Sequence, residues 1–224
     1  MKKKAFRAAL PYSLPICIGF LFIAMSYGFL MRSRGFSVFY PMAMSAFIFA
    51  GSMEFVAVEL LLSAYAPLHA FLLTLMVNAR HLFYGISMLE KYRGLGKKRF
   101  FLIFGLCDET FSIASTAQPP EGVDRGSFYF FVTLFDYLYW VGGTLLGGLL
   151  GSVIPFSTEG LDFALTALFV VLFLGQLENA GSRIYGLIGT ACSLAVLLAV
   201  GADNMVILSM ALILIVLLIG RKRI

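Results

Sequence analysis

Residues 38–62 read VFYPMAMSAFIFAGSMEFVAVELLL, an apolar stretch that carries a Gly-Ser pair and the acidic residue Glu54 near its middle. About 20 mostly apolar residues cross the hydrocarbon core of a bilayer, so this stretch is long enough for a membrane segment. A charge at the bilayer centre costs about 2.5–3.5 kcal/mol on insertion scales, and the charges that proteins keep there mark functional sites. We therefore expect a membrane segment that is interrupted at Ala50-Gly51-Ser52 and holds Glu54 at a functional depth.

The rest of the chain has the same apolar character. Its 224 residues are 60% hydrophobic and 13% charged, whereas soluble domains average about 45–50% and about 25%. This composition predicts an all-α polytopic membrane protein that forms a single transmembrane transporter domain, residues 1–224. The expected membrane segments are 11–30, 38–62, 66–89, 100–117, 126–153, 161–178, 184–200 and 204–220.

Basic residues concentrate in three short runs, at 2–7, 91–99 and 221–223. Short basic runs beside apolar segments are the positive-inside signal, so we expect all three runs on the cytoplasmic side of the cell membrane. The net charge of +5 therefore does not indicate nucleic-acid binding, which would need a solvated basic face on a folded module. The lipid bilayer is the expected surroundings of the chain.

Segment parity constrains the topology. Three apolar segments lie between two cytoplasmic runs, so we expect 38–62 to enter and leave on one side as a hairpin or broken helix. The loop 118–125 would then lie outside, and 126–153 would be a second interrupted element. The result is about six full crossings plus two interrupted segments, an arrangement that fits an inverted repeat. The alternative is that one basic loop breaks the rule, or that two short helices replace a hairpin.

The first polar cluster, Gly51-Ser52-Met53-Glu54, lies at the expected break. A second half-helix that begins near Ser52 would turn its positive end toward the break, where a carboxylate is favoured. Glu54 would then take an ammonium group or a proton. The alternative is a simple kink in which Glu54 caps the half-helix. The candidate substrate-binding residues are Gly51, Ser52 and Glu54, with Asn78 and Asp108 from the next two clusters.

The second and third clusters read Asn78-Ala79-Arg80-His81 and Cys107-Asp108-Glu109. Arginine stays charged, so Arg80 needs a partner or a wet cavity. Either Asp108 or Glu109 can form a structural ion pair with Arg80 while the other faces a cavity, because consecutive helix residues point about 100° apart. His81, Asp108 and Glu109 are the candidate proton-coupling groups.

Other features predict packing. Asp136 is a weaker proton candidate, and Asp162 lies near a segment end. Glycines at 143, 147 and 151 permit close helix packing, within the chain or with a partner subunit. The aromatic residues of 128–140, Trp140 included, are expected at lipid-facing or interfacial positions. Three cysteines, Cys17, Cys107 and Cys192, fall in apolar segments and are expected to be buried thiols.

The sequence does not predict an enzyme. It has no protease nucleophile motif, no His-Glu-x-x-His, no phosphate-binding Gly-x-x-x-x-Gly-Lys-Ser/Thr loop and no Cys/His metal spacing. We expect neither a cofactor nor a metal. If the chain moves a solute, an ion gradient or the gradient of the solute must drive it.

The clusters also resemble a known family. The runs Ala50–Phe55, Asn78–Gly85 and Gly105–Phe111, with further matches at Ser13–Pro15 and Leu161–Phe169, resemble the AzlC-type branched-chain amino acid permeases. The resemblance implies export of a small apolar amino acid and a separate small hydrophobic partner of the AzlD type. Members commonly have glutamine at the position of Glu54 and often threonine at that of Cys107, so this chain differs at a titratable position.

We therefore predict a secondary transporter that exports branched-chain or similar amino acids, coupled to protons. One alternative is a non-transporting membrane scaffold in which Arg80, Asp108 and Glu109 form a structural network. Another is a cation or weak-acid pathway that uses Glu54. Replacing Glu54 by Gln would leave a scaffold unaffected, alter the selectivity or coupling of an exporter, and abolish a cation pathway.

Overall fold

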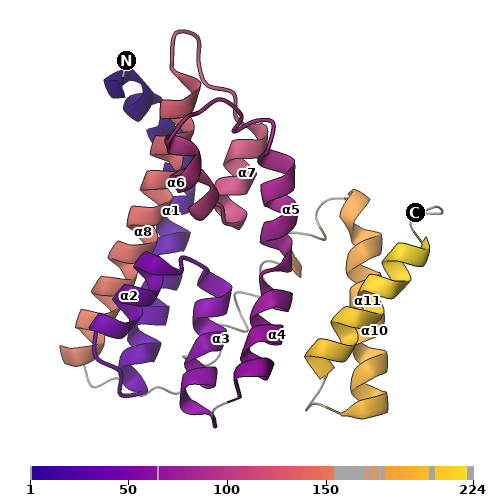
Figure 1. Cartoon of the computed structure of the whole chain (residues 1–224). Helices are drawn as coiled ribbons and strands as arrows, with labels where there is room; N and C mark the ends of the chain where they lie inside the picture. The colour runs from indigo at the N-terminus through magenta and orange to yellow at the C-terminus, as the bar shows by residue number, and fades with distance from the viewer. Residues whose placement is uncertain are drawn as a thin grey trace. The chain divides into compact units, whose positions relative to one another are not determined.

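The computed structural model describes residues 2–64, 66–153, 180–201 and 205–220, together with 170, 173, 174 and 177. Every regular element in this part of the chain is a helix, which confirms the predicted all-α class (Figure 1). The helices are α1 (Lys2–Ser33), α2 (Phe39–Phe47), α3 (Gly51–Leu62), α4 (Pro67–Val77), α5 (Ala79–Met88), α6 (Lys98–Phe104), α7 (Asp108–Thr116), α8 (Arg125–Val153), α10 (Ala180–Val200) and α11 (Met205–Gly220).

These helices form two compact units. The first unit contains α1, α2, α3, α5, α6, α7 and α8, and the second contains α4, α10 and α11. Most of the expected segment 161–178, including Asp162, lies outside the described residues.

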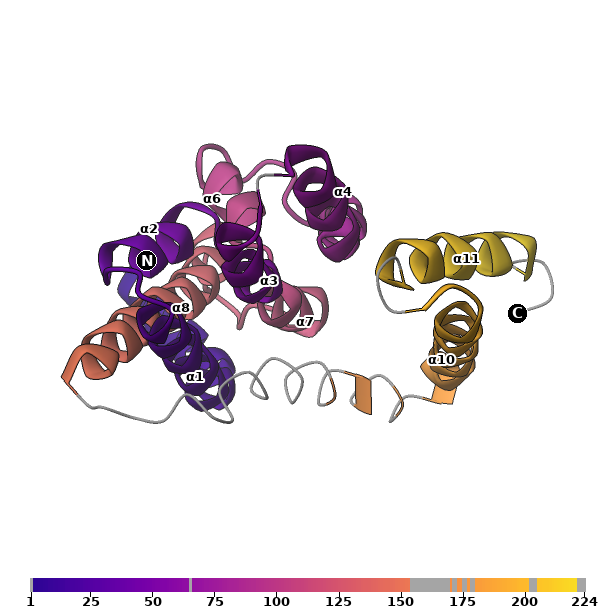
Figure 2. The ribbon, with the colours of Figure 1, turned by 90° about the horizontal axis from the view of Figure 1, so that it is seen from below.

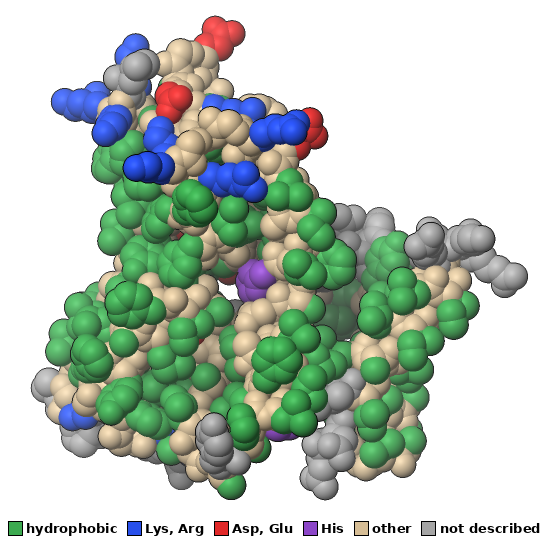
Figure 3. Space-filling view, viewed as in Figure 1, with side chains coloured by type: hydrophobic (Ala, Val, Ile, Leu, Met, Phe, Trp, Pro, Cys, Tyr) green, Lys and Arg blue, Asp and Glu red, His purple; other side chains and the backbone are tan. Residues whose placement is uncertain are grey.

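Within the described part, three helices are long and apolar enough to cross a membrane: α1, α8 over Arg125–Ser152, and α10 over Arg183–Val200. Hydrophobic side chains cover most of the visible helix surface (Figure 3). Ile18, Phe47 and Phe100 are each more than three-quarters exposed. Exposed apolar surface of this extent suits a lipid environment, so the structure agrees with a membrane protein.

Helices α1 and α8 lie side by side along the first unit (Figure 2). The glycines of the 143–151 repeat face α1: a Cβ on Gly143 would lie 2.7 Å from the Cβ of Ala24, and one on Gly147 would clash with the carbonyl of Met25. Gly151 meets the side chain of Arg32 in the same way. Of the two expected uses of the glycine repeat, packing within the chain is confirmed, since the repeat lies against α1.

Three interruptions divide the apolar segments. The segment 38–62 is broken between α2 and α3, as predicted, where Phe49 has a positive φ of 50°. The segment 66–89 was expected to be continuous, but it is broken at Asn78 between α4 and α5. The segment 100–117 is broken at 105–107 between α6 and α7. Each interruption lies beside one of the three polar clusters.

The break before α7 has a local cause. The hydroxyl of Thr110 accepts a hydrogen bond from the amide of Cys107 and donates one to the carbonyl of Gly105, at 2.8 Å each. Gly105 itself lies against the methyl group of Thr133, where a Cβ would clash. The threonine thus satisfies backbone groups that the interruption frees, as a capping residue does.

The prediction of a second interrupted segment, at 126–153, is wrong. Residues 126–153 belong to one continuous helix, α8. Gly143 and Gly147 of this segment bring α8 close to α1, and this packing offsets the roughly 1 kcal/mol that glycine costs within a helix. The expected pairing of interrupted segments in two inverted halves therefore does not form.

The pair α6–α7 returns to the end of the first unit where it began. Lys98, at the start of α6, lies 3.0 Å from Asp124 and 2.8 Å from the hydroxyl of Ser127, at the start of α8. Helices of seven and nine residues rise only about 10 and 14 Å, too little to cross about 30 Å of hydrocarbon. The loop 118–125 thus lies at the same end as 91–99, and the prediction that it faces the opposite side is wrong. The basic side chains of this end gather at the top of Figure 3.

Asp124 caps α8 at this end. Its carboxylate accepts a 2.8 Å hydrogen bond from the amide of Ser127 in addition to the ion pair with Lys98. The hydrogen bonds from Ser127, and next the bond from Lys98, lower the pKa of Asp124 to about 2. The charged form therefore persists through the physiological range.

Candidate functional site

The three polar clusters meet at Arg80. Its Nη2 atom donates a 2.8 Å hydrogen bond to the hydroxyl of Ser52 in the first turn of α3. The same atom lies 2.9 Å from Oδ2 of Asp108, the first residue of α7. Arg80 itself stands in the first turn of α5. One guanidinium group thus connects the starts of three helices, each of which follows an interruption.

The surroundings of Arg80 explain why it needs this pairing. A cation in the first turn of a helix is opposed by the helix dipole, whereas Asp108 at the start of α7 is favoured by it. The Arg80 and Asp108 side chains are only 32% and 23% exposed. Tyr84 donates a 2.6 Å hydrogen bond to Oδ1 of Asp108, and its ring stacks on Phe111 at 4.3 Å between centroids. Both Asp108 oxygens are therefore held in place.

Two polar atoms beside this ion pair have no hydrogen-bond partner among the described residues. Asn78 Oδ1 and Arg80 Nε are buried and form no hydrogen bond within the described part of the chain. Asn78 occupies the N-cap position of α5 without a side-chain capping bond. A buried polar group left unsatisfied costs about 1–3 kcal/mol. The site therefore presents one free acceptor and one free donor, two residues apart in sequence.

Glu54 lies at the α2–α3 break and is only 1% exposed. It accepts hydrogen bonds from the hydroxyl of Ser45 and the amide of Ala50, both at 3.0 Å. The indole N–H of Trp140 lies 3.1 and 3.2 Å from its two oxygens. Three donors around one carboxyl suit the ionised form, which only accepts. This geometry favours the capping interpretation of Glu54 over direct contact with a substrate.

The environment of Trp140 differs from the expectation. Trp140 is 3% exposed and lies against Gly51, where a Cβ would come within 2.8 Å of the indole ring. Its predicted lipid-facing or interfacial position is wrong, because its N–H is needed inside by Glu54. One signal could have indicated this: Trp140 is the single tryptophan of the chain and lies within an apolar segment instead of at its end.

The remaining candidates lie near Arg80 without pairing with it. His81 packs edge-on against Tyr84, with ring centroids 5.8 Å apart. It also lines a pocket of about 310 Å³ between α5 and α6, together with Leu82, Ile86 and Leu106. Glu109 lies beside the thiol of Cys107.

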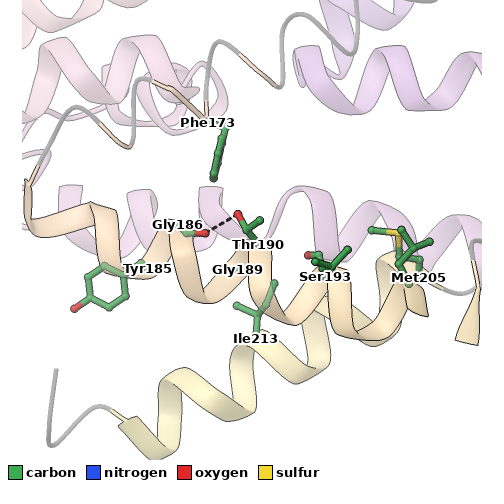
Figure 4. Close-up of a pocket in the computed structure, with 10 residues that line it drawn as sticks. Phe173, Tyr185, Gly186, Gly189, Thr190, Ser193, Met205 and Ile213 are labelled. Atoms are coloured by element: carbon green, nitrogen blue, oxygen red, sulfur yellow. Dashed lines mark hydrogen bonds between the residues drawn. The ribbon is translucent and has the colours of Figure 1, made fainter. Parts of the chain in front are cut away.

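The second unit contains a larger pocket of about 690 Å³ (Figure 4). Its described lining is apolar or neutral, with Thr190 donating a 2.9 Å hydrogen bond to the carbonyl of Gly186. No charged side chain is among these described lining residues. The described lining of this pocket therefore offers no counter-charge to an ion, in contrast to the Arg80 cluster.

Comparison with known proteins identifies the family of this chain. A family profile described as AzlC protein matches residues 15–154. The branched-chain amino acid transport protein AzlC of Bacillus subtilis (strain 168) is 56% identical over 218 residues, which cover 97% of this chain and 86% of that protein. An uncharacterized membrane protein of Haemophilus influenzae is 43% identical, over 91% of this chain and 84% of the relative. The inner membrane protein YgaZ of Escherichia coli (strain K12) is 30% identical, over 76% and 72%.

No solved structure matches the chain. The relatives are named as transport or membrane proteins, which agrees with the apolar helices and the buried polar clusters of this structure. The family profile covers the α2–α3 break, Arg80 and the acidic start of α7. The chain is a membrane protein and belongs to the AzlC family.

Proposed function

We propose that this chain is a secondary carrier that exports branched-chain amino acids, driven by the proton gradient and working with a small AzlD-type membrane subunit. The similarity to a protein named for branched-chain amino acid transport supports the substrate class. The observation that carries the proposal is the pair of unsatisfied atoms, Asn78 Oδ1 and Arg80 Nε, at the meeting point of three helix starts.

These atoms complement an amino acid zwitterion. The substrate carboxylate would bind Arg80 Nε and the positive end of α3 near Gly51 and Ser52, because both favour an anion. The substrate ammonium would bind Asn78 Oδ1 and the carboxylate of Asp108, which are acceptors. Binding would satisfy the buried atoms and so recover the free energy that their unpaired state costs.

The pocket between α5 and α6 suits the apolar end of the substrate. Its volume of about 310 Å³ lies at the lower end of the usual range for ligand sites, about 300–1,000 Å³. Leu82, Ile86 and Leu106 supply apolar walls, and His81 connects the pocket with its sequence neighbour Arg80. A branched aliphatic side chain would pack against these walls, whereas a cationic one would meet the charge of Arg99 in the lining and lose its hydration without gaining a partner.

The proposed topology has six crossings and two re-entrant pairs, α2–α3 and α6–α7. With the basic end of the first unit in the cytoplasm, α6–α7 enters and leaves on that side, and 118–125 also faces the cytoplasm. Segment 126–153 then leads outward, and three further segments return the basic run 221–223 to the cytoplasm, in agreement with the positive-inside rule. The single transporter domain predicted from sequence is retained in this proposal.

Proteoliposomes loaded with leucine test the carrier function. Purified protein, with and without a co-expressed AzlD-type subunit, should take up labelled leucine by counterflow, and an imposed pH gradient should drive accumulation. Asn78→Ala and Arg80→Lys should reduce counterflow at least tenfold in folded protein. Ser87→Ala, on the exposed side of α5, is the matched control and should leave counterflow unchanged.

The outcomes separate the alternatives. If the folded protein exchanges no leucine, valine or isoleucine, either with or without the AzlD-type subunit, the proposed carrier function is contradicted. If Arg80→Lys lowers only the yield of folded protein, Arg80 acts as a scaffold residue. If Glu54→Gln abolishes an ion flux that occurs without an amino acid, the chain is a cation pathway.

A further inference from the structure

One face of α8 carries a row of buried polar or aromatic side chains. Thr133, Asp136, Trp140 and Thr144 follow one another at helical spacing and are at most 3% exposed. Residues three and four apart share a helix face, so these four form one stripe. We call it the α8 stripe.

The α8 stripe contacts both re-entrant pairs. Thr133 packs on Gly105 at the α6–α7 break. Trp140 donates to Glu54 at the α2–α3 break, and Thr144 lies 2.9 Å from the hydroxyl of Ser45 in α2. Asp136 stands between these two contacts. It is eleven residues from the start of α8, about 16 Å at 1.5 Å per residue, near the middle of a core about 30 Å thick.

Asp136 is fully buried and unsatisfied. Its exposure is 0%, and neither carboxyl oxygen has a hydrogen-bond partner within the described part of the chain. Glu54 in the same unit shows the opposite pattern, with three donors around its carboxyl. A buried anion without donors is far more expensive than the neutral acid, so the two environments suit opposite protonation states.

Among the described residues, the groups that interact electrostatically with Asp136 do not supply a counter-ion. From α7 and the residue before it come Glu109 and the thiol of Cys107, both close enough to interact electrostatically with Asp136. From α8 itself comes Tyr139, which lies 3.2 Å from the hydroxyl of Ser13 in α1. The nearby carboxyl of Glu109 makes a second negative charge at Asp136 still less favourable.

We propose that Asp136 binds and releases the proton that drives transport, an inference that rests on the proposed carrier function. In this conformation Asp136 holds the proton. A second conformation brings water or a hydrogen-bond donor to the carboxyl, the O–H bond breaks, and the proton leaves to the aqueous phase on that side. The carboxylate then takes up one proton from the other side, so no other bond changes. Glu109, partly exposed, is the neighbouring carboxyl through which the proton passes.

Asp136→Asn tests this assignment, because the amide has the same shape but cannot release a proton. Leucine counterflow, which needs no net proton movement, should stay within about twofold of wild type. Accumulation driven by an imposed pH gradient should fall at least tenfold. Asp124→Asn makes the same chemical change at the exposed start of α8 and should leave both rates unchanged.

Several results would overturn the assignment. If Asp136→Asn still accumulates leucine in response to the pH gradient, another group carries the proton. If the folded variant loses counterflow as well, Asp136 contacts the substrate or positions a group that does. If Asp136→Asn does not fold, Asp136→Glu is tested in its place. This variant keeps a titratable carboxyl, so it should support gradient-driven uptake with a shifted pH profile. An unshifted pH profile contradicts the proposal.

Infrared spectroscopy distinguishes a failure of the Asp136 assignment from a failure of the proposed carrier function. Wild-type protein in lipid should show the carbonyl band of a protonated carboxylic acid that Asp136→Asn lacks, whether or not leucine is transported. Absence of that band difference contradicts a protonated Asp136. If the band is present in a protein that never exchanges an amino acid, the carrier function is contradicted. The protonated state of Asp136 is still supported in that case.

Discussion

Replacing Trp140 with Phe should destabilise the α2–α3 break. Phenylalanine keeps an aromatic ring against Gly51 but removes the N–H that lies 3.1 and 3.2 Å from the two Glu54 oxygens. Glu54 is 1% exposed, so water cannot replace the lost donor without opening the break. Hydrogen bonds to charged groups contribute about 1.5–3 kcal/mol, and we expect the free energy of unfolding to fall by that amount.

Thermal unfolding in detergent micelles, followed by helical circular dichroism, measures this loss. For a chain of this size 1 kcal/mol shifts the midpoint by about 2–4 °C, so the variant should melt about 3–12 °C below wild type. Tyr137→Phe, three residues earlier in the same helix, is the matched control. It removes a neutral 3.1 Å bond to the carbonyl of Ala46 and should cost only about 0.5–1.5 kcal/mol.

A double-mutant cycle with Glu54→Gln assigns the effect to this contact. With a neutral amide at position 54, the cost of Trp140→Phe should fall by at least half, because the bond no longer involves a charge. If Trp140→Phe costs less than about 0.5 kcal/mol, or costs the same with Glu and Gln at position 54, Trp140 does not hold the carboxylate, and the account of this break is refuted.

Three further predictions address packing, capping and the ion pair. Gly147→Leu should prevent close packing of α8 on α1 and cost several kcal/mol of stability or abolish folding, whereas Gly142→Leu, with open space at its Cβ, should be nearly neutral in the same melting assay. Asp124→Ala should cost about 1 kcal/mol as a lost N-cap. Because the pKa of Asp124 is lowered to about 2, its contribution should be complete above about pH 4 and disappear as the pH falls through about 2; a variant and wild type that differ equally at pH 2 and pH 7 would contradict this. Tyr84→Phe should cost about 1–2 kcal/mol by removing the 2.6 Å bond to Asp108, and an unchanged midpoint would show that the bond does not stabilise the folded state.

The sequence was sufficient for the all-helical class of the fold and for the expectation that an acidic residue pairs with Arg80. Apolar composition determines a helical membrane protein, because lipid leaves few other ways to satisfy the backbone. The break in 38–62 was predictable from Gly51, Ser52 and Glu54, since small and polar residues interrupt an apolar helix there. The sequence offered either Asp108 or Glu109 as the partner of Arg80, and the structure selects Asp108, whose Oδ2 lies 2.9 Å from Nη2 of Arg80.

The other breaks were hidden because hydropathy is the same in a continuous helix and in two half-helices. The interruption at 105–107 depends on Thr110 bonding back to Gly105 and Cys107, a local geometry that composition does not reveal. In 126–153 segment parity predicted a break, but the helix is continuous and its glycines contact α1, which the segment alone does not show. The burial of Trp140 and Asp136 follows from the elements that pack on α8, information that arises only in the folded chain.

The most direct test of the account is protection of a cysteine beside Arg80. In a variant without native cysteines, Ser52→Cys places a thiol where Arg80 contacts α3, and Ser87→Cys on the exposed side of α5 is the control. Leucine should slow maleimide labelling of Ser52→Cys severalfold and leave Ser87→Cys unchanged, and isopentylamine, which lacks the carboxylate, should not protect. Equal labelling rates at Ser52→Cys with and without leucine, at concentrations that support counterflow, would contradict a substrate site at the meeting point of the three helix starts.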